Sequence, residues 1–262
     1  MIEKVKRRLV KTLADYSVSS LRTKPRNKVG SIKFLGYTVA YPDAASFVNE
    51  YNDIFINRIY DFIADNDTPF IIDAGACIGM STLFWKLKYP AANIIAFEPD
   101  PAIYQILQQN LDANNIDQIK LVKSGLGLVD EIKRFYPDGS DGGSFHTQLG
   151  EGPSIELKIE RLSNYITQPV DLLKMNIEGA EAEVIQEIEP VLHLVKEIIF
   201  EYHAFSHLPQ NLGKILTTLD RAGFKYVLSE TATERTQRPF NFDKPYRCFN
   251  LVYAKRKTGP TS

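Results

Sequence analysis

The stretch that decides the fold is residues 71–81, Ile71-Ile72-Asp73-Ala74-Gly75-Ala76-Cys77-Ile78-Gly79-Met80-Ser81. Its first residues form an apolar, β-branched run that is typical of a buried strand. Apolar side chains then recur at helical spacing from residue 80 to residue 87, so the glycines lie in a turn between a strand and a helix. Glycine adopts positive φ angles and lets a ligand approach the backbone, while the free N–H groups at a helix start favour electron-rich groups. The stretch therefore predicts a ligand-binding turn at the carboxyl end of a strand.

The alternation of strand and helix continues along the chain. Short β-branched runs predict buried strands over Phe70–Asp73, Asn93–Glu98, Ile119–Val122, Leu172–Ile177 and Ile198–Tyr202. Apolar stripes predict helices that begin near Met80, at Pro101 behind the capping residue Asp100, near Val184, and near Leu212. Gly223 ends the last helix, and two further strands pair antiparallel at one edge, Phe224–Leu228 and Phe249–Ala254. This order is typical of an α/β fold whose mostly parallel sheet is covered by helices on both faces.

We expect the chain to consist of a core and two flanking parts. Residues 1–69 are expected to form a helical and strand extension that packs on the core, residues 70–257 the core, and residues 258–262 a flexible tail. Near the N-terminus, basic residues alternate with apolar ones in an amphipathic helical pattern, namely Lys4, Val5, Lys6, Arg7, Arg8, Leu9, Lys11 and Leu13. This pattern indicates the solvated face of a docking helix, with weak peripheral membrane contact as the alternative.

One stretch of the core departs from the regular alternation. The strand-like runs Ile132–Tyr136 and Ile155–Ile159 flank a segment that is crowded with Gly, Asp and Ser. We therefore expect a hairpin excursion over about residues 128–162. Its tip, residues 137–153, is either a lid that closes over a ligand or a tolerated surface insertion.

Composition and charge exclude several classes of protein. The 262 residues are 44% hydrophobic and 24% charged, as in a globular protein with a sizeable core. Lys and Arg total 31 against 32 for Asp and Glu, so no net basic field attracts nucleic acid. No apolar run approaches the roughly 20 residues of a membrane-spanning helix, and a secretory signal is missing, so we expect a cytoplasmic protein. Cys77 and Cys248 form neither a disulfide framework nor a CxxC metal pair.

Glu98 ends the second predicted strand, in the sequence Ala96-Phe97-Glu98-Pro99-Asp100. At this spacing, α/β nucleotide-binding folds place an acid that accepts hydrogen bonds from both ribose hydroxyls and repels a ribose phosphate. Combined with the glycine turn, Glu98 favours an unphosphorylated adenosine ligand such as S-adenosylmethionine or NAD. The glycine spacing is not the GxGxxG of dinucleotide-binding folds, which argues against NAD.

Polar residues interrupt the fourth predicted strand, where residues 174–181 read KMNIEGAE. A strand that is buried on both faces should be nearly all apolar, yet Lys174, Asn176 and Glu178 share one face by the period of two. At the carboxyl end of a central strand, this pattern favours a functional site, and a buried structural network is the alternative.

Glu201 and His203 share a face where the fifth predicted strand ends. A carboxylate there can orient an imidazole, so His203 is a candidate catalytic or substrate-binding residue, with a structural histidine as the alternative. His207 follows four residues later, but Leu208 and Pro209 give little reason for a helix between the two histidines. We therefore expect no metal site.

These segments, in this order, resemble the FkbM family of S-adenosylmethionine-dependent methyltransferases. The family pattern has an Asp-x-Gly-Ala-Asn-x-Gly turn, a Phe-Glu-Pro strand end, a Lys-x-Asp-x-Glu-Gly-Ala-Glu segment and a later Glu-x-His, and the match covers most of residues 50–255. The resemblance implies a Rossmann-like class I methyltransferase fold with a seven-stranded, mostly parallel sheet and an antiparallel edge strand. It also implies O-methylation of a hydroxyl on a sugar, a glycan or another hydroxylated metabolite.

The resemblance extends to the site residues. The residues expected to bind the cofactor are Asp73, Gly75, Ala76, Gly79, Met80, Ser81, Glu98, Pro99, Ser124, Gly125 and Asn176. Two positions depart from the pattern, because Cys77 stands where the family has Asn, and Asn176 where it has Asp. An amide cannot act as a general base, so any proton transfer by the family's Asp has been moved elsewhere in this chain or lost. We expect His203, oriented by Glu201, to be the base, and Glu178 is the second candidate.

Two other functions stay open at this point. An NAD-dependent oxidoreductase is compatible with Glu98, and a non-catalytic binding module that keeps the fold is compatible with Asn176. The expected partner is a small-molecule or glycan acceptor rather than nucleic acid, and the sequence makes no prediction of the oligomeric state.

Overall fold

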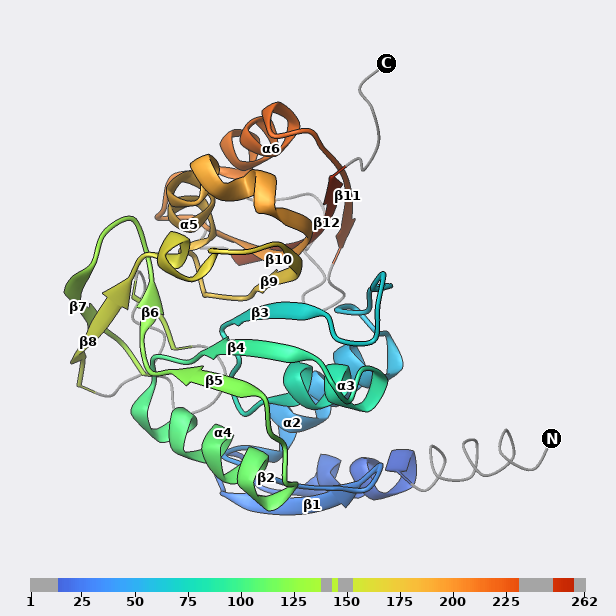
Figure 1. Cartoon of the computed structure of the whole chain (residues 1–262). Helices are drawn as coiled ribbons and strands as arrows, with labels where there is room; N and C mark the ends of the chain where they lie inside the picture. Colours follow the sequence, from blue (N-terminus) through green and yellow to red (C-terminus); the bar gives the residue numbers. More distant parts are fainter. Residues whose placement is uncertain (1–13, 138–142, 146–152, 231–246, 257–262) are drawn as a thin grey trace.

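A seven-stranded sheet forms the centre of the computed structural model, which describes residues 14–137, 143–145, 153–230 and 247–256 (Figure 1). The strand order is β11-β12-β10-β9-β3-β4-β5. The strands are β3 (Phe70–Ala74), β4 (Asn93–Phe97), β5 (Ile119–Val122), β9 (Val170–Met175), β10 (Val195–Phe205), β11 (Phe224–Glu230) and β12 (Arg247–Arg256). Neighbours are parallel except β12, which runs antiparallel to both β10 and β11. The predicted mostly parallel sheet with an antiparallel pair at one edge is confirmed, with β12 next to the edge strand β11.

Helices cover both faces of this sheet (Figure 1). They are α3 (Met80–Lys88) and α4 (Pro101–Ala113) on one face, and α5 (Glu181–Glu187) and α6 (Leu212–Arg221) on the other, with the short turns η3 (Leu162–Tyr165) and η4 (Glu189–Leu194). Successive strand residues point to opposite faces, so Ile71 packs in the core beneath α3 while Ile72 packs in the core beneath α5 and α6. The apolar strands of the sequence are therefore buried on both sides.

The helix and strand ends follow the predicted local chemistry in most places. The Asp100 side chain accepts hydrogen bonds from the Ala102 and Ile103 N–H groups, and Pro101 occupies the first turn of α4. Gly223 follows α6 with a φ of 83°. The strand β10 is longer than predicted, because its pairing with β12 continues to Phe205.

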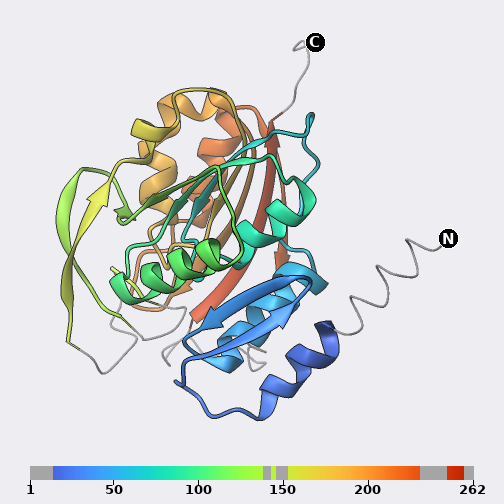
Figure 2. The same cartoon turned by 60° about the horizontal axis from the view of Figure 1, so that its bottom comes forward.

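The N-terminal part packs against α3 and α4 (Figure 2). Its elements are η1 (Ser20–Thr23), the hairpin of β1 (Gly30–Phe34) and β2 (Tyr37–Tyr41), α2 (Ala44–Tyr51), and the π-helical turn η2 (Asn52–Ile56). The backbone of β2 is satisfied from α4, since Asn110 Oδ1 accepts from Ala40 N at 2.7 Å and Asn114 Oδ1 accepts from Thr38 N at 2.8 Å. Residues 4–13, predicted as an amphipathic helix, and the tail 258–262 lie outside the described residues.

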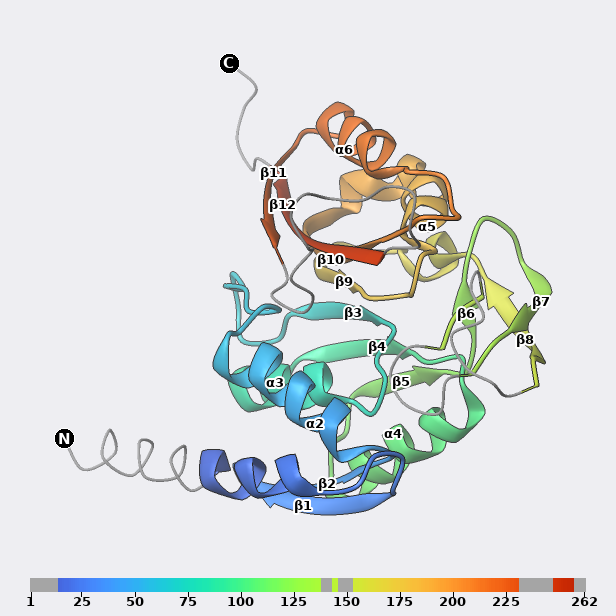
Figure 3. The same ribbon diagram turned by 180° about the vertical axis from the view of Figure 1, so that it is seen from behind.

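A second, three-stranded sheet with the order β6-β8-β7 lies beside the central one (Figure 3). It contains β6 (Gly125–Leu126), β7 (Glu131–Phe135) and β8 (Ile155–Glu160). The strands β7 and β8 pair antiparallel, which confirms the pair of strands predicted around the excursion. Of the predicted tip, residues 143–145 return to the body of the protein, where Ser144 bridges to Tyr136; residues 138–142 and 146–152 lie outside the described residues.

Candidate active site

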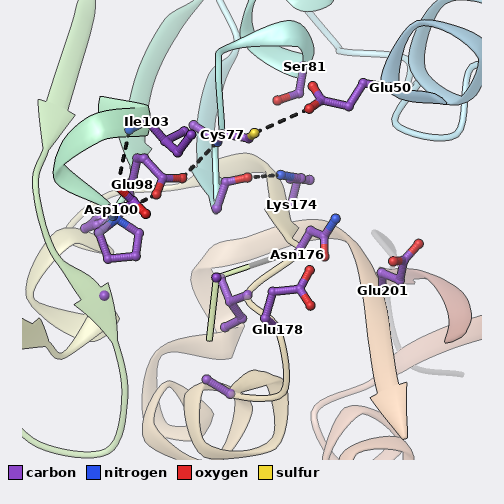
Figure 4. Close-up of a pocket in the computed structure, with 18 of the residues that line it drawn as sticks. Glu50, Cys77, Ser81, Glu98, Asp100, Ile103, Lys174, Asn176, Glu178 and Glu201 are labelled. Atoms are coloured by element: carbon purple, nitrogen blue, oxygen red, sulfur yellow. Dashed lines mark hydrogen bonds between the residues drawn. The ribbon is translucent and has the colours of Figure 1, made fainter. Parts of the chain in front are cut away.

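A cavity of about 500 Å³ lies at the carboxyl ends of β3, β4, β9 and β10. Open α/β sheets bind ligands at this edge. Figure 4 shows Glu98 and Asp100 at one end of the cavity and Asn176, Glu178 and Glu201 at the other. The N-terminal part and the returning segment 143–145 also contribute to the wall. Segments that are far apart in the sequence thus meet around one space.

Gly75 is required by the turn that follows β3. Its φ is 79°, and a Cβ at this position would lie 1.9 Å from the backbone oxygen of Asn176. The N–H groups of Gly75 and Ala76 donate to the backbone oxygen of Phe97, at 3.1 and 2.8 Å. The turn therefore passes close to two neighbouring strands, which only glycine permits.

A buried ion pair holds this turn from below. Lys174 Nζ lies 3.0 Å from Asp73 Oδ1 and donates to the backbone oxygen of Gly75 at 2.5 Å. The other oxygen of Asp73 accepts from Ser81 Oγ and Thr82 Oγ1, at 2.6 and 3.0 Å. Both charged side chains are almost fully buried, so their pairing offsets the cost of removing them from water. Asp73 thus fixes the turn and the start of α3 instead of reaching the cavity.

Glu98 connects the turn to the start of α4. Its carboxylate accepts from the Cys77 N–H at 3.0 Å and from the Asp100 N–H at 2.9 Å. Glu98 lines the cavity although it is only 7% exposed. Burial raises the pKa of Glu98 to about 8, against the lowering effect of its two backbone hydrogen bonds. Two donors from a ligand, such as a pair of ribose hydroxyls, would stabilise the charged form.

Two buried polar atoms in the cavity wall lack a partner among the described residues. They are Ser124 Oγ and Asn176 Oδ1. An unbonded polar atom inside a protein is costly, and one that faces a cavity can be satisfied by a ligand. With Glu98, these atoms provide the hydrogen-bonding groups that an adenosine and an amino-acid group require. The residues present therefore fit an S-adenosylmethionine-type cofactor.

His203 lies among three carboxylates. Its Nε2 is 3.3 Å from Glu178 Oε1 and 3.4 Å from Glu201 Oε1, and its Nδ1 is 3.0 Å from Glu181 Oε1. Burial by itself would lower the pKa of His203, but the charges of Glu178 and Glu181 outweigh it and raise this pKa well above its usual range. Three carboxylates around one imidazole favour its protonated form, and a protonated imidazole cannot accept a proton. This geometry argues against His203 as the general base.

Of the three polar residues predicted on one face of the fourth strand, Asn176 and Glu178 reach the cavity after the chain has left β9. Lys174, Asn176 and Glu178 all line the cavity, as the sequence predicts, but β9 ends at Met175. Glu178 has a φ of 54°, and its backbone oxygen accepts from Ser144 Oγ at 2.9 Å. A left-handed turn, braced by the returning segment, thus directs the Glu178 side chain.

Besides Asp73, two predicted cofactor residues lie away from the cavity. Met80 is fully buried in the core beneath α3, because the first turn of that helix points its apolar side chain toward the sheet. Gly79 has a φ of 93°, and a Cβ there would meet Leu107 Cδ1 at 2.8 Å. Gly79 therefore permits the turn and the packing of α4, which corrects the prediction of close ligand approach at this position.

The structure adds residues that the sequence reasoning missed. Glu50 and Asp53 line the cavity from α2 and η2, and Tyr60 lies beneath Lys174 with its ring 5.1 Å from Nζ. No motif distinguishes these residues in the sequence, because only packing brings the N-terminal part to the sheet. Glu181 was visible as the last residue of the 174–181 motif, but its contact with His203 was not.

Neither a metal site nor a membrane span is found in the described part of the chain. It holds no group of three or more His, Cys, Asp or Glu side chains arranged to bind a metal ion. Within the same residues, no helix has the length and hydropathy needed to cross a bilayer.

The matching family model and two similar proteins are all described as methyltransferases. The family model described as "Methyltransferase FkbM domain" matches residues 73–226. Methyltransferase 1 from Beauveria bassiana is 30% identical over 164 residues, which cover 53% of this chain and 66% of that protein. Methyltransferase sdnD from Sordaria araneosa is 30% identical over 204 residues, which cover 64% of this chain and 78% of that protein. The chain thus spans just under two thirds of the Beauveria protein.

A solved structure shares the fold. The crystal structure of Methyltransferase FkbM from Methylobacillus flagellatus KT superposes with a TM-score of 0.51 and 17% identity, over 74% of this chain and 45% of that chain. The family model covers more than half of the chain and includes the turn after β3, Glu98, the 174–181 motif and His203. This chain belongs to the FkbM methyltransferase family.

Proposed function

We propose that this chain is an S-adenosylmethionine-dependent methyltransferase that acts on a hydroxyl oxygen of a sugar, a glycan or another hydroxylated metabolite. The observation that carries this proposal is the combination of groups in one cavity. Glu98 and Ser124 offer partners for an adenosine, while Glu178 and Glu201 offer carboxylates for an acceptor. Membership of the FkbM family supports the same reaction class.

The chain's first task is to hold the cofactor. Glu98 would accept the ribose hydroxyls, Ser124 would border the adenine, and Asn176 Oδ1 would accept from the amino group. S-adenosylmethionine, when bound, supplies a methyl group that is activated by a positively charged sulfur. The protein then has to place an acceptor oxygen in line with that methyl group and keep water out.

The second task is to remove a proton. A neutral hydroxyl is a poor nucleophile, and a positioned base contributes about 10² to 10⁴ in rate. Asn176 cannot serve, and the carboxylates around His203 favour its protonated form. We assign the base to Glu201, because burial raises its pKa. The charge of His203 opposes this effect, but the charges of Glu178 and Glu181 add to it, and the pKa of Glu201 stays above its usual range. A carboxylate with a raised pKa is a stronger base.

Methyl transfer and the two rival functions are distinguished by one set of measurements. Calorimetry with S-adenosylmethionine, S-adenosylhomocysteine and NAD in parallel tests the cofactor. A screen over sugars, glycans and hydroxylated metabolites, read as S-adenosylhomocysteine formed, tests the reaction. Binding without turnover on any acceptor would favour the non-catalytic module, and binding of NAD alone would favour an oxidoreductase.

Substitution of the carboxylates tests the assignment of the base. Glu201→Gln should lower kcat by about 10² or more, with cofactor affinity nearly unchanged. Glu178→Gln keeps the size of the side chain and should cost less, because Glu178 acts through its charge on Glu201. The reverse order of losses would move the base to Glu178.

A further inference from the structure

Glu181 is a buried carboxylate behind the cavity, at the first residue of α5. It has no exposed surface, and it is not among the residues that line the cavity. Its Oε1 accepts from the N–H groups of Ile177 and Gly179, both at 3.3 Å, and lies 3.0 Å from His203 Nδ1. The same carboxylate therefore touches the turn that carries Glu178 and the far side of the imidazole.

The partners of His203 decide its protonation on geometric grounds. On one side, Nδ1 faces Glu181 Oε1 and, at 3.1 Å, the backbone oxygen of Glu201. On the other side, Nε2 faces the carboxylates of Glu178 and Glu201. Carboxylates and carbonyl oxygens only accept hydrogen bonds, so both ring nitrogens must donate. Among the described residues, the aromatic rings that contact the imidazole are those of Phe205 and Phe249, which carry no charge.

The three carboxylates differ in what they can do for a ligand. Glu178 and Glu201 line the cavity, and both share the single Nε2–H of His203. Glu181 contacts only the opposite nitrogen, so its charge reaches the cavity through the imidazole. A second proton on an otherwise buried imidazole needs a nearby negative charge, since burial disfavours the charged form.

We propose that Glu181 is a positioning residue of the acceptor site: it keeps His203 doubly protonated, so that Nε2–H holds the Glu178 and Glu201 carboxylates in place for the acceptor. This inference rests on the proposed methyltransferase function for its consequence, but the protonation of His203 can be measured without any acceptor. Loss of the Glu181 charge should leave two cavity carboxylates close together without a cation. Asp53, whose charge also acts on Glu201, would then add to the repulsion.

The test uses the full chain labelled with ¹⁵N-histidine and records ring ¹⁵N–¹H correlations from pH 6 to pH 9. The signal of His203 is the one lost in His203→Asn. In the wild type, both ring nitrogens should show the imidazolium shifts throughout this range. In Glu181→Gln, which keeps an oxygen for the turn's N–H groups, the midpoint of the His203 titration should fall by at least one pH unit.

Glu183→Gln is the matched control. Glu183 lies on the same helix, pairs with Lys133 at 3.9 Å, and is 34% exposed at its side chain. Its substitution should leave the His203 signal unchanged. Thermal unfolding of the wild type, Glu181→Gln and Glu183→Gln shows whether Glu181→Gln is folded. If it is not, Glu181→Asp is measured in its place. This variant keeps the charge on a shorter side chain, so His203 should remain an imidazolium.

Kinetics provide the second readout once an acceptor is known. In Glu181→Gln, kcat relative to wild type should fall at least tenfold at pH 8 and recover toward pH 6, where His203 regains its proton, while the Kd of S-adenosylhomocysteine changes less than twofold. A purely structural role would give a ratio independent of pH. Two results would overturn the inference: an unchanged His203 titration in folded Glu181→Gln, or loss of the imidazolium in Glu181→Asp. Failure to find any acceptor would count against the proposed function alone.

Discussion

Removal of the Glu98 carboxylate should weaken cofactor binding by an amount that the structure allows to be calculated. One oxygen of Glu98 accepts from the Cys77 N–H and the other from the Asp100 N–H, and the residue lines the cavity. Hydrogen bonds to a charged group contribute about 1.5 to 3 kcal/mol, so Glu98→Ala should raise the Kd of S-adenosylhomocysteine by roughly 10- to 150-fold. Isothermal titration calorimetry measures this, and Asp112→Ala, an exposed change on the following helix α4, is the control.

The same carboxylate should make binding depend on pH. With a pKa of about 8 in the free protein, Glu98 is mostly protonated at pH 7, and ribose hydroxyls bind better to the charged form. Binding therefore releases a proton, and affinity should rise with pH until the pKa of the free protein is passed. At pH 7, one unit below this pKa, about a tenth of the free protein carries a charged Glu98, whereas at pH 9 most of it does. The Kd at pH 9 should therefore be roughly tenfold lower than at pH 7, which corresponds to about 1.4 kcal/mol.

The two effects share one control. Glu98→Ala lacks the titrating group, so the part of the pH dependence that comes from Glu98 should disappear and only the titration of the ligand itself should remain. A Kd within threefold of wild type in folded Glu98→Ala, or an identical pH slope in both proteins, would refute the placement of Glu98 at the ribose.

Other substitutions test the turn, the returning segment and the role of metals. In thermal unfolding, Gly75→Ala should lower the stability of the fold by about 1 to 3 kcal/mol more than Gly36→Ala does. The two glycines have similar φ angles, but a Cβ at Gly36 would lie in open space, whereas a Cβ at Gly75 would meet the backbone of Asn176. Equal losses of stability would show that φ alone matters. Ser144→Ala removes the hydrogen bond to the Glu178 backbone, which contributes about 1 kcal/mol. In steady-state kinetics, the KM of the acceptor should rise several-fold while cofactor affinity stays unchanged. An unaltered KM would argue against the idea that Ser144 braces the turn that carries Glu178. EDTA should leave turnover unchanged, since neither nitrogen of His203 has a lone pair to offer a metal, and a loss restored by added metal would contradict this.

Local patterns in the sequence were sufficient for the central sheet and for the part of the cavity wall around Gly75 and Glu98. The apolar run before Gly75, the Asp100-Pro101 cap and the acid at Glu98 act through neighbouring residues, and each lies where the pattern predicts. Such features depend on backbone geometry and on side-chain periodicity within one strand, turn or helix, which the order of residues determines. The antiparallel edge pair of β11 and β12 was predictable for the same reason.

The cluster of carboxylates around His203 was decided by the tertiary structure. Periodicity placed Glu201 beside His203, but the charges that decide the protonation of His203 come from Glu178 and Glu181 on another segment. Glu50 and Asp53 likewise enter the cavity only because the N-terminal part packs on α3 and α4. Electrostatic interactions depend on distance in space and on burial rather than on separation along the chain. The sequence alone therefore determined which groups this protein has at its strand ends, and only the folded arrangement decided which of them lie close enough for one charge to act on another.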